Sequence, residues 1–329
     1  MIASDALVQA PAVATRQTSQ RWVVAWHTLR STHRGALIWG AVFGLFVVSS
    51  VTAYITGFPT QTERQQLART LQTFSILLGP PRNADTVAGF TQWRVLLVAG
   101  IMGAIWGMLT STSRLRGEEE NGRWELLLAG PLTKRAATLQ VLVGLGGAWL
   151  LMFGTTALLV LLSGRLPGAR FPVTGSLLLA AAMTSGAAMW LAMGAVASQV
   201  SATRGQALRI CAALLGASFL VRMLADSRTS LGWLRWLSPL GWLEEVHPLR
   251  SPQPLALLPV LAVILGCCAV AIWLAEWRDL NASLLQEGTA RRHETAWSAG
   301  ILSLAIRITQ PAAIGWLLGA GVLSLVTGV

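Results

Sequence analysis

The chain has 329 residues, of which 53% are hydrophobic and only 12% are charged. Its mean hydropathy of +0.57 excludes an ordinary soluble domain. The net charge of +11 does not indicate a nucleic-acid-binding protein, because the arginines are spread over every connector between apolar runs. We expect these bases to meet lipid headgroups, and we expect no nucleic-acid partner.

About seven apolar runs are long enough to cross a bilayer, which takes roughly 20 residues of helix. Backbone in lipid must satisfy its own hydrogen bonds, so runs of this length predict helices. The expected fold is therefore an all-α polytopic membrane protein. The expected spans lie near residues 36–56, 95–113, 139–163, 173–197, 207–225, 255–275 and 312–329.

Residues 1–34 form the expected N-terminal tail, which lacks the basic start and apolar core of a cleavable signal peptide. Between residues 19 and 33, Trp22, Trp26 and Leu29 fall on one helical face. This spacing predicts an interfacial elbow helix that lies in the headgroups before the first span. The alternative is a basic flank of that span.

The connector at residues 57–94 carries a capping-box pattern at Thr60 and Glu63, which predicts a helix start. Leucines such as Leu67 follow at helical spacing. We expect an amphipathic helix on the membrane surface, ended by Gly79-Pro80-Pro81.

A charged island at residues 114–135 holds four acids and five bases. We expect a short helix that begins after Gly122 and stops at Gly130-Pro131, with Glu118–Glu120 just before its start, where the helix dipole favours anions. Trp124 and the leucines that follow give this helix an apolar surface that can dock in a groove of a partner protein. The alternative is a solvated connector that rests on the membrane.

No catalytic or metal-binding pattern is visible. The only lysine, Lys134, is not part of a Gly-Lys-Ser/Thr sequence, so these residues hold no standard P-loop. The histidines have no metal-ligand spacing, and the three cysteines fall inside predicted spans, where we expect them to pack. Charged residues near span ends are expected to snorkel to the headgroups, which argues against a proton relay; they are Arg209, Arg222 and Glu276.

One pattern recurs along the chain. The segment Arg30-x-Thr32-x-x-x-Ala36-Leu37-x-Trp39 returns as Arg307-x-Thr309-x-x-x-Ala313-Ile314-x-Trp316, at a constant offset of 277 residues (307 − 30). We interpret this as the start of a second repeat. Residues 280–311 would then form a linker and second elbow, and residues 312–329 the first span of an incomplete repeat. We accordingly expect an N-terminal fragment of a longer protein.

Four motifs together resemble the permeases of ABC-2 type ATP-binding-cassette exporters. They are Glu120-x-Gly122-x-x-Glu125-x-x-Leu128-x-x-Pro131, Gly89-Phe90-Thr91-x-Trp93-Arg94, Ser198-Gln199 with Arg204, and Ser238-Pro239-Leu240-Gly241-Trp242. They cover most of residues 1–279. More narrowly, the chain resembles the actinobacterial branch of polyketide-antibiotic (tetronasin-type) and multidrug exporters.

The resemblance implies a six-helix transmembrane unit of the type V exporter kind at residues 35–279, with a coupling segment at 114–135. It also implies a second permease half, in the same longer chain or as a dimer, and two copies of a separate ATPase subunit that binds ATP and Mg. This chain would itself bind no cofactor and would not be an enzyme. The expected ATPase contacts are Glu118, Glu119, Glu120, Gly122, Arg123, Glu125, Leu127, Leu128 and Pro131, with a second contact at Gln199 and Arg204.

Connectors alternate between the two sides of the membrane, and 15 of the 25 basic residues fall on the N-terminal side. The positive-inside rule then places the N-terminus in the cytoplasm of a bacterial plasma membrane. The expected function is export of amphipathic antibiotics, drugs or lipid-like compounds; the alternative is a membrane scaffold or sensor that recruits a partner without transport. Candidate substrate-path residues, which could equally be packing or lipid contacts, are Trp39, Phe43, Phe46 and Trp106.

Overall fold

The computed structural model describes residues 22–129 and 132–277. Throughout these residues the regular structure is helical, and six helices are long and apolar enough to cross a membrane, as the sequence predicts. The six are α2 (Val23–Gly57), α5 (Val87–Thr112) with its continuation to Glu120, α8 (Lys134–Ser163), α9 (Val173–Val200), α10 (Arg204–Ser227) and α12 (Leu257–Trp277). The seventh predicted span, the linker before it and residues 1–21 lie outside the described residues.

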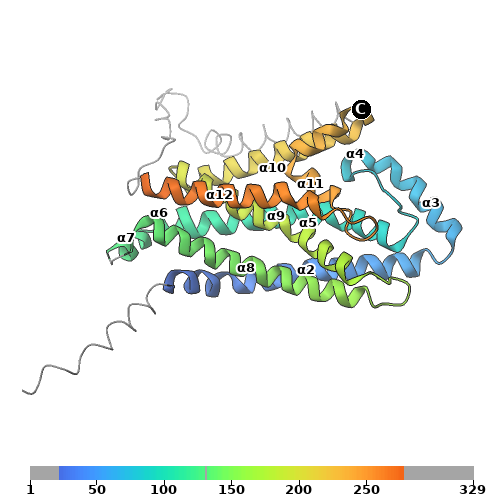
Figure 1. The fold of residues 1–329 in the computed structure, drawn as a ribbon, viewed down its shortest axis with the longest axis horizontal. Helices are drawn as coiled ribbons and strands as arrows, with labels where there is room; N and C mark the ends of the chain where they lie inside the picture. Colours follow the sequence, from blue (N-terminus) through green and yellow to red (C-terminus); the bar gives the residue numbers. More distant parts are fainter. Residues whose placement is uncertain (1–21, 130–131, 278–329) are drawn as a thin grey trace, which may run out of the picture.

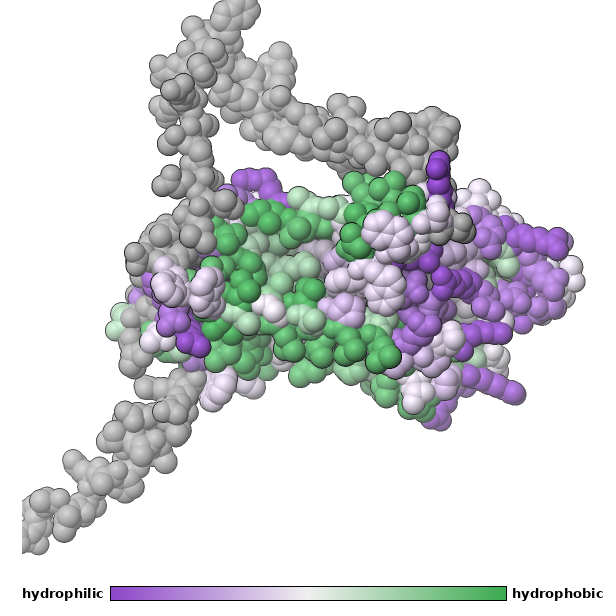
Figure 2. Space-filling view, turned by 45° about the horizontal axis from the view of Figure 1, so that its top comes forward, coloured by the Kyte–Doolittle hydropathy of each residue, from purple (hydrophilic) through white to green (hydrophobic). Residues whose placement is uncertain are grey.

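The long helices run in alternating directions, so their ends gather at the two ends of an elongated bundle (Figure 1). We call the end that holds residues 113–128 and 200–204 the island end, and the end that holds residues 58–86 and 228–256 the loop end. Figure 2 shows hydrophobic residues over the middle of the bundle and hydrophilic residues at the loop end. Such a band matches the apolar core of a bilayer.

Helix α9 is the centre of the bundle, and 78% of its apolar stretch is buried, against 17% for α12. It packs against α5 through glycine and alanine. A Cβ atom at Gly186 would overlap the carbonyl oxygen of Gly100, and one at Gly107 would lie 2.5 Å from the carbonyl oxygen of Ala187. Small residues thus allow the two backbones to touch, which compensates for the lack of a hydrophobic driving force between helices in lipid.

A second close pair is formed by α2 and α8. A Cβ atom at Gly144 would lie 2.5 Å from the carbonyl oxygen of Ala25, and one at Gly40 would lie 2.7 Å from that of Met152. The Thr156 hydroxyl donates a hydrogen bond to the carbonyl oxygen of Gly40 at 3.2 Å. The four helices α2, α8, α9 and α5 therefore form a connected core.

The expectation of a separate elbow helix is wrong, because α2 continues from Val23 to Gly57 without a break. The first turns cannot leave the bundle for the headgroups: Val24 and Ala25 are buried, and the Val24 backbone N–H donates to the Gln140 side chain at 3.2 Å. Trp22 and Trp26 remain exposed on the other face, where an aromatic belt would lie.

At the loop end the capping box is confirmed. The Thr60 side chain accepts a hydrogen bond from the Glu63 backbone, and the Glu63 side chain accepts one from the Thr60 backbone, at the start of α3 (Gln61–Leu71). The chain continues through η1 (Gln72–Phe74) into α4 (Ser75–Leu78). Gly79, with a φ of +87°, then ends the helical run as predicted.

We predict that Gly186→Ala destabilises the bundle, because its added methyl group must push α5 away from α9. The cost of such overpacking is about 1–3 kcal/mol. Thermal denaturation of the detergent-purified protein should show a lower midpoint.

Gly154→Ala in α8 is the matched control, since nothing lies within 4 Å of its Cβ position. This substitution should leave the midpoint unchanged or raise it, because alanine favours helix. Equal midpoints for the two variants would contradict the close contact.

Candidate functional site

The charged island continues helix α5 and does not stand apart from it. After Thr112 the helix widens into a π-helical turn, η2 (Ser113–Gly117), and runs on through α6 (Glu118–Glu120). The chain then turns at Gly122, which has a φ of +70°, into the short helix α7 (Arg123–Leu128). The predicted helix start after Gly122 is confirmed, whereas its expected stop at residues 130–131 lies outside the described residues.

The three glutamates of α6 therefore form the C-terminal end of a long helix and also precede α7. At the C-terminal end of a helix the dipole disfavours anions. The expectation that the helix dipole stabilises Glu118–Glu120 is therefore reversed for the helix that these residues end. Arginines compensate for this. Glu118 lies 3.4 Å from Arg114 and 2.8 Å from Arg123, and Glu119 lies 2.9 Å from Arg116.

Arg116 joins the island to the connector between α9 and α10. Its side chain is only 4% exposed, and its Nε donates to the carbonyl oxygen of Ala202 at 2.8 Å. On the same side, the Glu120 carboxylate accepts a hydrogen bond from the backbone N–H of Arg204. A Cβ atom at Gly117 would lie 3.3 Å from the Arg204 side chain. The two predicted contact regions, far apart in sequence, thus form one surface.

The predicted contact residues differ in accessibility. Glu125 is exposed on α7, where a partner can reach it, whereas Gln199 is buried. Leu127 and Leu128 occupy helical positions, and Pro131 lies outside the described residues.

Trp124 departs from the expected docking surface. It is 7% exposed and belongs to the main core cluster. It lines a groove of about 360 Å³ whose other apolar walls include Val24 and Val141. Trp124 therefore anchors α7 to the bundle and does not offer its ring to a partner protein.

The loop end holds a cluster of charges that the sequence analysis missed. Arg222 and Asp226, on the last turns of α10, have fully buried side chains. The Arg222 guanidinium lies 3.0 Å from Asp226 and 2.8 Å from Glu244 of α11 (Pro239–Glu245). The expected snorkelling of Arg222 is therefore wrong, because the side chain turns inward to two carboxylates. The spacing of Arg222 and Asp226, four residues apart inside an apolar run, was the available signal.

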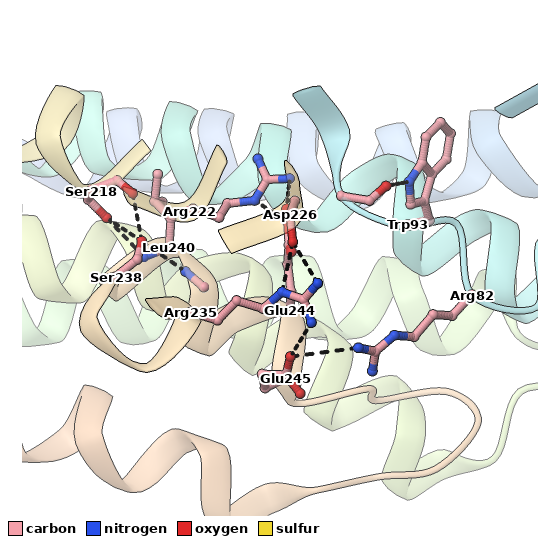
Figure 3. A network of polar contacts seen from close by, with 12 residues as sticks. Arg82, Trp93, Ser218, Arg222, Asp226, Arg235, Ser238, Leu240, Glu244 and Glu245 are labelled. Carbon is pink, nitrogen blue, oxygen red and sulfur yellow. Dashed lines mark hydrogen bonds and ion pairs between the residues drawn. The ribbon is translucent and has the colours of Figure 1, made fainter. Parts of the chain in front are cut away.

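Further contacts extend this cluster (Figure 3). Arg235, from η3 (Thr229–Leu237), lies 2.7 Å from Asp226 and 3.4 Å from Glu245, and Arg82 lies 3.9 Å from Glu245. We call the six residues the clasp: Arg82, Arg222, Asp226, Arg235, Glu244 and Glu245. It connects α10, η3, α11 and the segment after α4. Among the residues that the structure describes, no group of three His, Cys, Asp or Glu side chains could hold a metal ion.

The backbone of Gly79 covers Arg222 and Glu244 of the clasp. A Cβ atom there would lie 3.0 Å from both Arg222 and Glu244, and the indole N–H of Trp93 donates to the Gly79 carbonyl oxygen at 2.7 Å. Burial raises the pKa of Glu244 to about 7, although the Arg222 charge opposes this shift. Burial and the nearby Arg82 charge lower the pKa of His247.

Three of the four predicted substrate-path residues meet in one place. Trp39, Phe43 and Phe46 of α2 line a groove of about 470 Å³ between α2 and α5. Trp106 lies elsewhere: it is buried, and its indole nitrogen lies 3.3 Å from the position of a Cβ atom at Gly35.

Comparison with known proteins gives two matches. A family model described as "Multidrug efflux system permease Rv1217c, C-terminal domain" matches residues 24–274. The multidrug efflux system permease protein Rv1217c of Mycobacterium tuberculosis is 27% identical over 298 residues, which cover 86% of this chain and 51% of that protein. The chain thus spans about half the length of this curated relative.

We predict that Arg116→Ala destabilises the protein by about 2–4 kcal/mol, because it removes the ion pair with Glu119 and the hydrogen bond that the part-buried carbonyl of Ala202 accepts from Arg116. Arg123→Ala is the control, since Arg123 is 62% exposed and its ion pair with Glu118 should contribute less than about 1 kcal/mol. Thermal midpoints of the two variants measure the difference. A larger loss in Arg123→Ala would contradict the role of Arg116.

We predict a pH-dependent stability difference between the wild type and Glu244→Gln. Because the folded-state pKa of Glu244 lies above the ordinary value of 4.5, its contribution to stability is fully present below pH 4.5 and is lost as pH rises through 7. The wild-type midpoint should therefore fall relative to Glu244→Gln between pH 5 and pH 8, by the equivalent of about 1–3 kcal/mol. Parallel pH profiles would contradict the burial of this carboxyl group.

Proposed function

The chain belongs to the family of multidrug efflux permeases described by the Rv1217c C-terminal domain, and from this premise we propose that it is the membrane-spanning part of an ATP-driven, ABC-2 type exporter. The observation that carries the proposal is the continuous surface that α6, α7 and the α9–α10 connector form at the island end. A standard P-loop is absent from this sequence, so ATP hydrolysis is assigned to a separate ATPase subunit that docks on this surface.

In this proposal α7, on which Arg123 and Glu125 are exposed, receives the movement of the ATPase. Trp124 fixes α7 to the bundle, and α6 links it to α5 without a chain break. Arg116 and Glu120 pass the same displacement to the start of α10. A π-helical turn at this junction supports the assignment, because such turns are frequent at functional sites.

The far end of α10 carries Arg222 and Asp226 of the clasp. Because α10 has 24 residues, its two ends are about 36 Å apart. If α10 moves as a rigid helix, a shift at the island end would also displace Arg222 and Asp226 and change the distances of their ion pairs at the loop end. We propose that these steps open the loop end while the island end closes, so that an amphipathic compound leaves the cell.

The finer assignments follow from the same premise. We propose that the N-terminus and the island end face the cytoplasm of a bacterial plasma membrane, as the distribution of basic residues favours. We further propose that a second permease half completes the transporter and that two ATPase copies serve it, since the curated relative is about twice as long as the matched region. Polyketide antibiotics of the tetronasin type and other amphipathic drugs are the proposed cargo.

We predict that Glu125→Lys and Leu127→Asp each reduce export without reducing the amount of protein in the membrane, because both change the charge of α7, the helix on which docking is proposed. Loss of one charge-assisted contact corresponds to about a tenfold effect. Efflux of a fluorescent amphipathic dye from cells that express the complete exporter measures the change.

Arg30→Glu is the control, since it reverses a charge at the same end of the bundle but on α2, where the side chain is exposed. Efflux equal to wild type in both α7 variants would contradict docking on α7. Efflux that persists with an inactivated ATPase would contradict ATP-driven transport, and drug sensitivity that is the same with and without the protein would favour the scaffold or sensor.

A further inference from the structure

The groove between α2 and α5 has a regular construction. On α2, Trp39, Phe43 and Phe46 follow each other at intervals of four and three residues, so their rings lie on one helical face. On α5, Val98 and Met102 form the opposite wall. Its volume of about 470 Å³ lies within the range of sites that take drug-sized molecules.

A cation, Arg94, lies beside this groove on the side nearest the loop end, in contact with the ring of Phe46. Arg94 precedes Val98 by four residues and therefore lies on the same face of α5 as Val98 and Met102. Its guanidinium carbon lies 5.8 Å from the ring centroid of Phe46, which lines the groove, and 5.8 Å from that of Phe90.

Arg94 also lacks an acidic partner. Within residues 22–129 and 132–277, no carboxylate forms an ion pair with Arg94, and no oxygen atom accepts a hydrogen bond from its side chain. Its partners there are the rings of Phe46 and Phe90. The half-buried guanidinium retains five N–H donors for a ligand. The two arginines that are buried within the described residues, Arg116 and Arg222, are each paired with carboxylates.

We propose that this groove binds amphipathic organic monoanions, with the apolar body against Trp39, Phe43 and Phe46 and the carboxylate on Arg94. The proposal deepens the proposed function by naming the class of cargo, and it rests on that function only for the fate of the bound molecule. Charge complementarity selects an acid, because a guanidinium and a carboxylate form a charge-assisted bidentate contact away from water.

The dimensions favour a single-chain acid over a phospholipid. Eight residues separate Arg94 from Met102, which corresponds to about 12 Å along the helix. One extended chain of about ten carbons matches that length, whereas two acyl chains and a headgroup exceed the volume of the groove.

The test uses the purified chain in nanodiscs of phosphatidylcholine, without ATP or ATPase, and the fluorescent probe dansylamino-undecanoic acid beside its methyl ester. The rise in dansyl emission gives both affinities. The wild type should bind the acid about tenfold more tightly than the ester. Arg94→Gln should abolish this preference and leave ester binding unchanged, and Arg94→Lys should keep part of it.

Two further variants test whether the binding depends on Arg94 and on the groove. Arg165→Gln removes an exposed arginine at the same end of the bundle and should behave as wild type. Ser49→Trp fills the groove and should weaken binding of both acid and ester.

Equal affinities of the wild type for acid and ester would overturn the proposal, as would unchanged binding in Ser49→Trp. Displacement of the acid by equimolar phosphatidylglycerol would also overturn it in favour of a lipid site. Because no transport is measured, failure here leaves the coupling proposal intact, and failure of ATP-driven export leaves the binding result intact.

Discussion

A buried arginine at each end of the bundle determines how its helices are joined. A guanidinium cannot lie in an apolar interior without carboxylates or carbonyl groups around it, because an unpaired buried charge costs several kcal/mol. Arg116 meets this requirement with Glu119 and the carbonyl oxygen of Ala202, and Arg222 meets it with Asp226 and Glu244. Each arginine therefore ties together segments that helix packing alone would leave independent.

Polar contacts hold α5 and α10 at both of their ends. Both helices have one end held by the Arg116 contacts and another end near the clasp, where Trp93 and Arg222 lie. The core pairs of α5 with α9 and of α2 with α8 come into close contact at glycines. The bundle thus combines close helix contacts at small residues in its middle with clusters of charged contacts at its ends.

Hydropathy predicted the six described spans, since a bilayer core leaves few alternatives for long apolar runs. Local chemistry likewise predicted the Thr60 capping box and the turn at Gly122. The long-range contacts were not predictable in the same way. The burial of Arg222 depends on acids of α11, and the pairing of the island with the α9–α10 connector depends on residues more than 80 positions apart. The inward-facing Trp124 similarly follows from the neighbours of α7 and not from its own sequence.

The backbone of Gly79 keeps water away from two charged residues of the clasp. Its bare backbone lies on Arg222 and Glu244, and the hydrogen bond from Trp93 keeps it there. While this cover is in place, the Arg222–Glu244 pair is shielded from water, and attraction between its charges is stronger than at the surface. If the α3–α4 segment lifts, water reaches the Arg222–Glu244 pair that Gly79 covers, and the attraction between these two charges falls towards the small value of a surface contact. Wetting of this one pair would weaken the contact between α10 and α11, because Arg222 belongs to the first helix and Glu244 to the second.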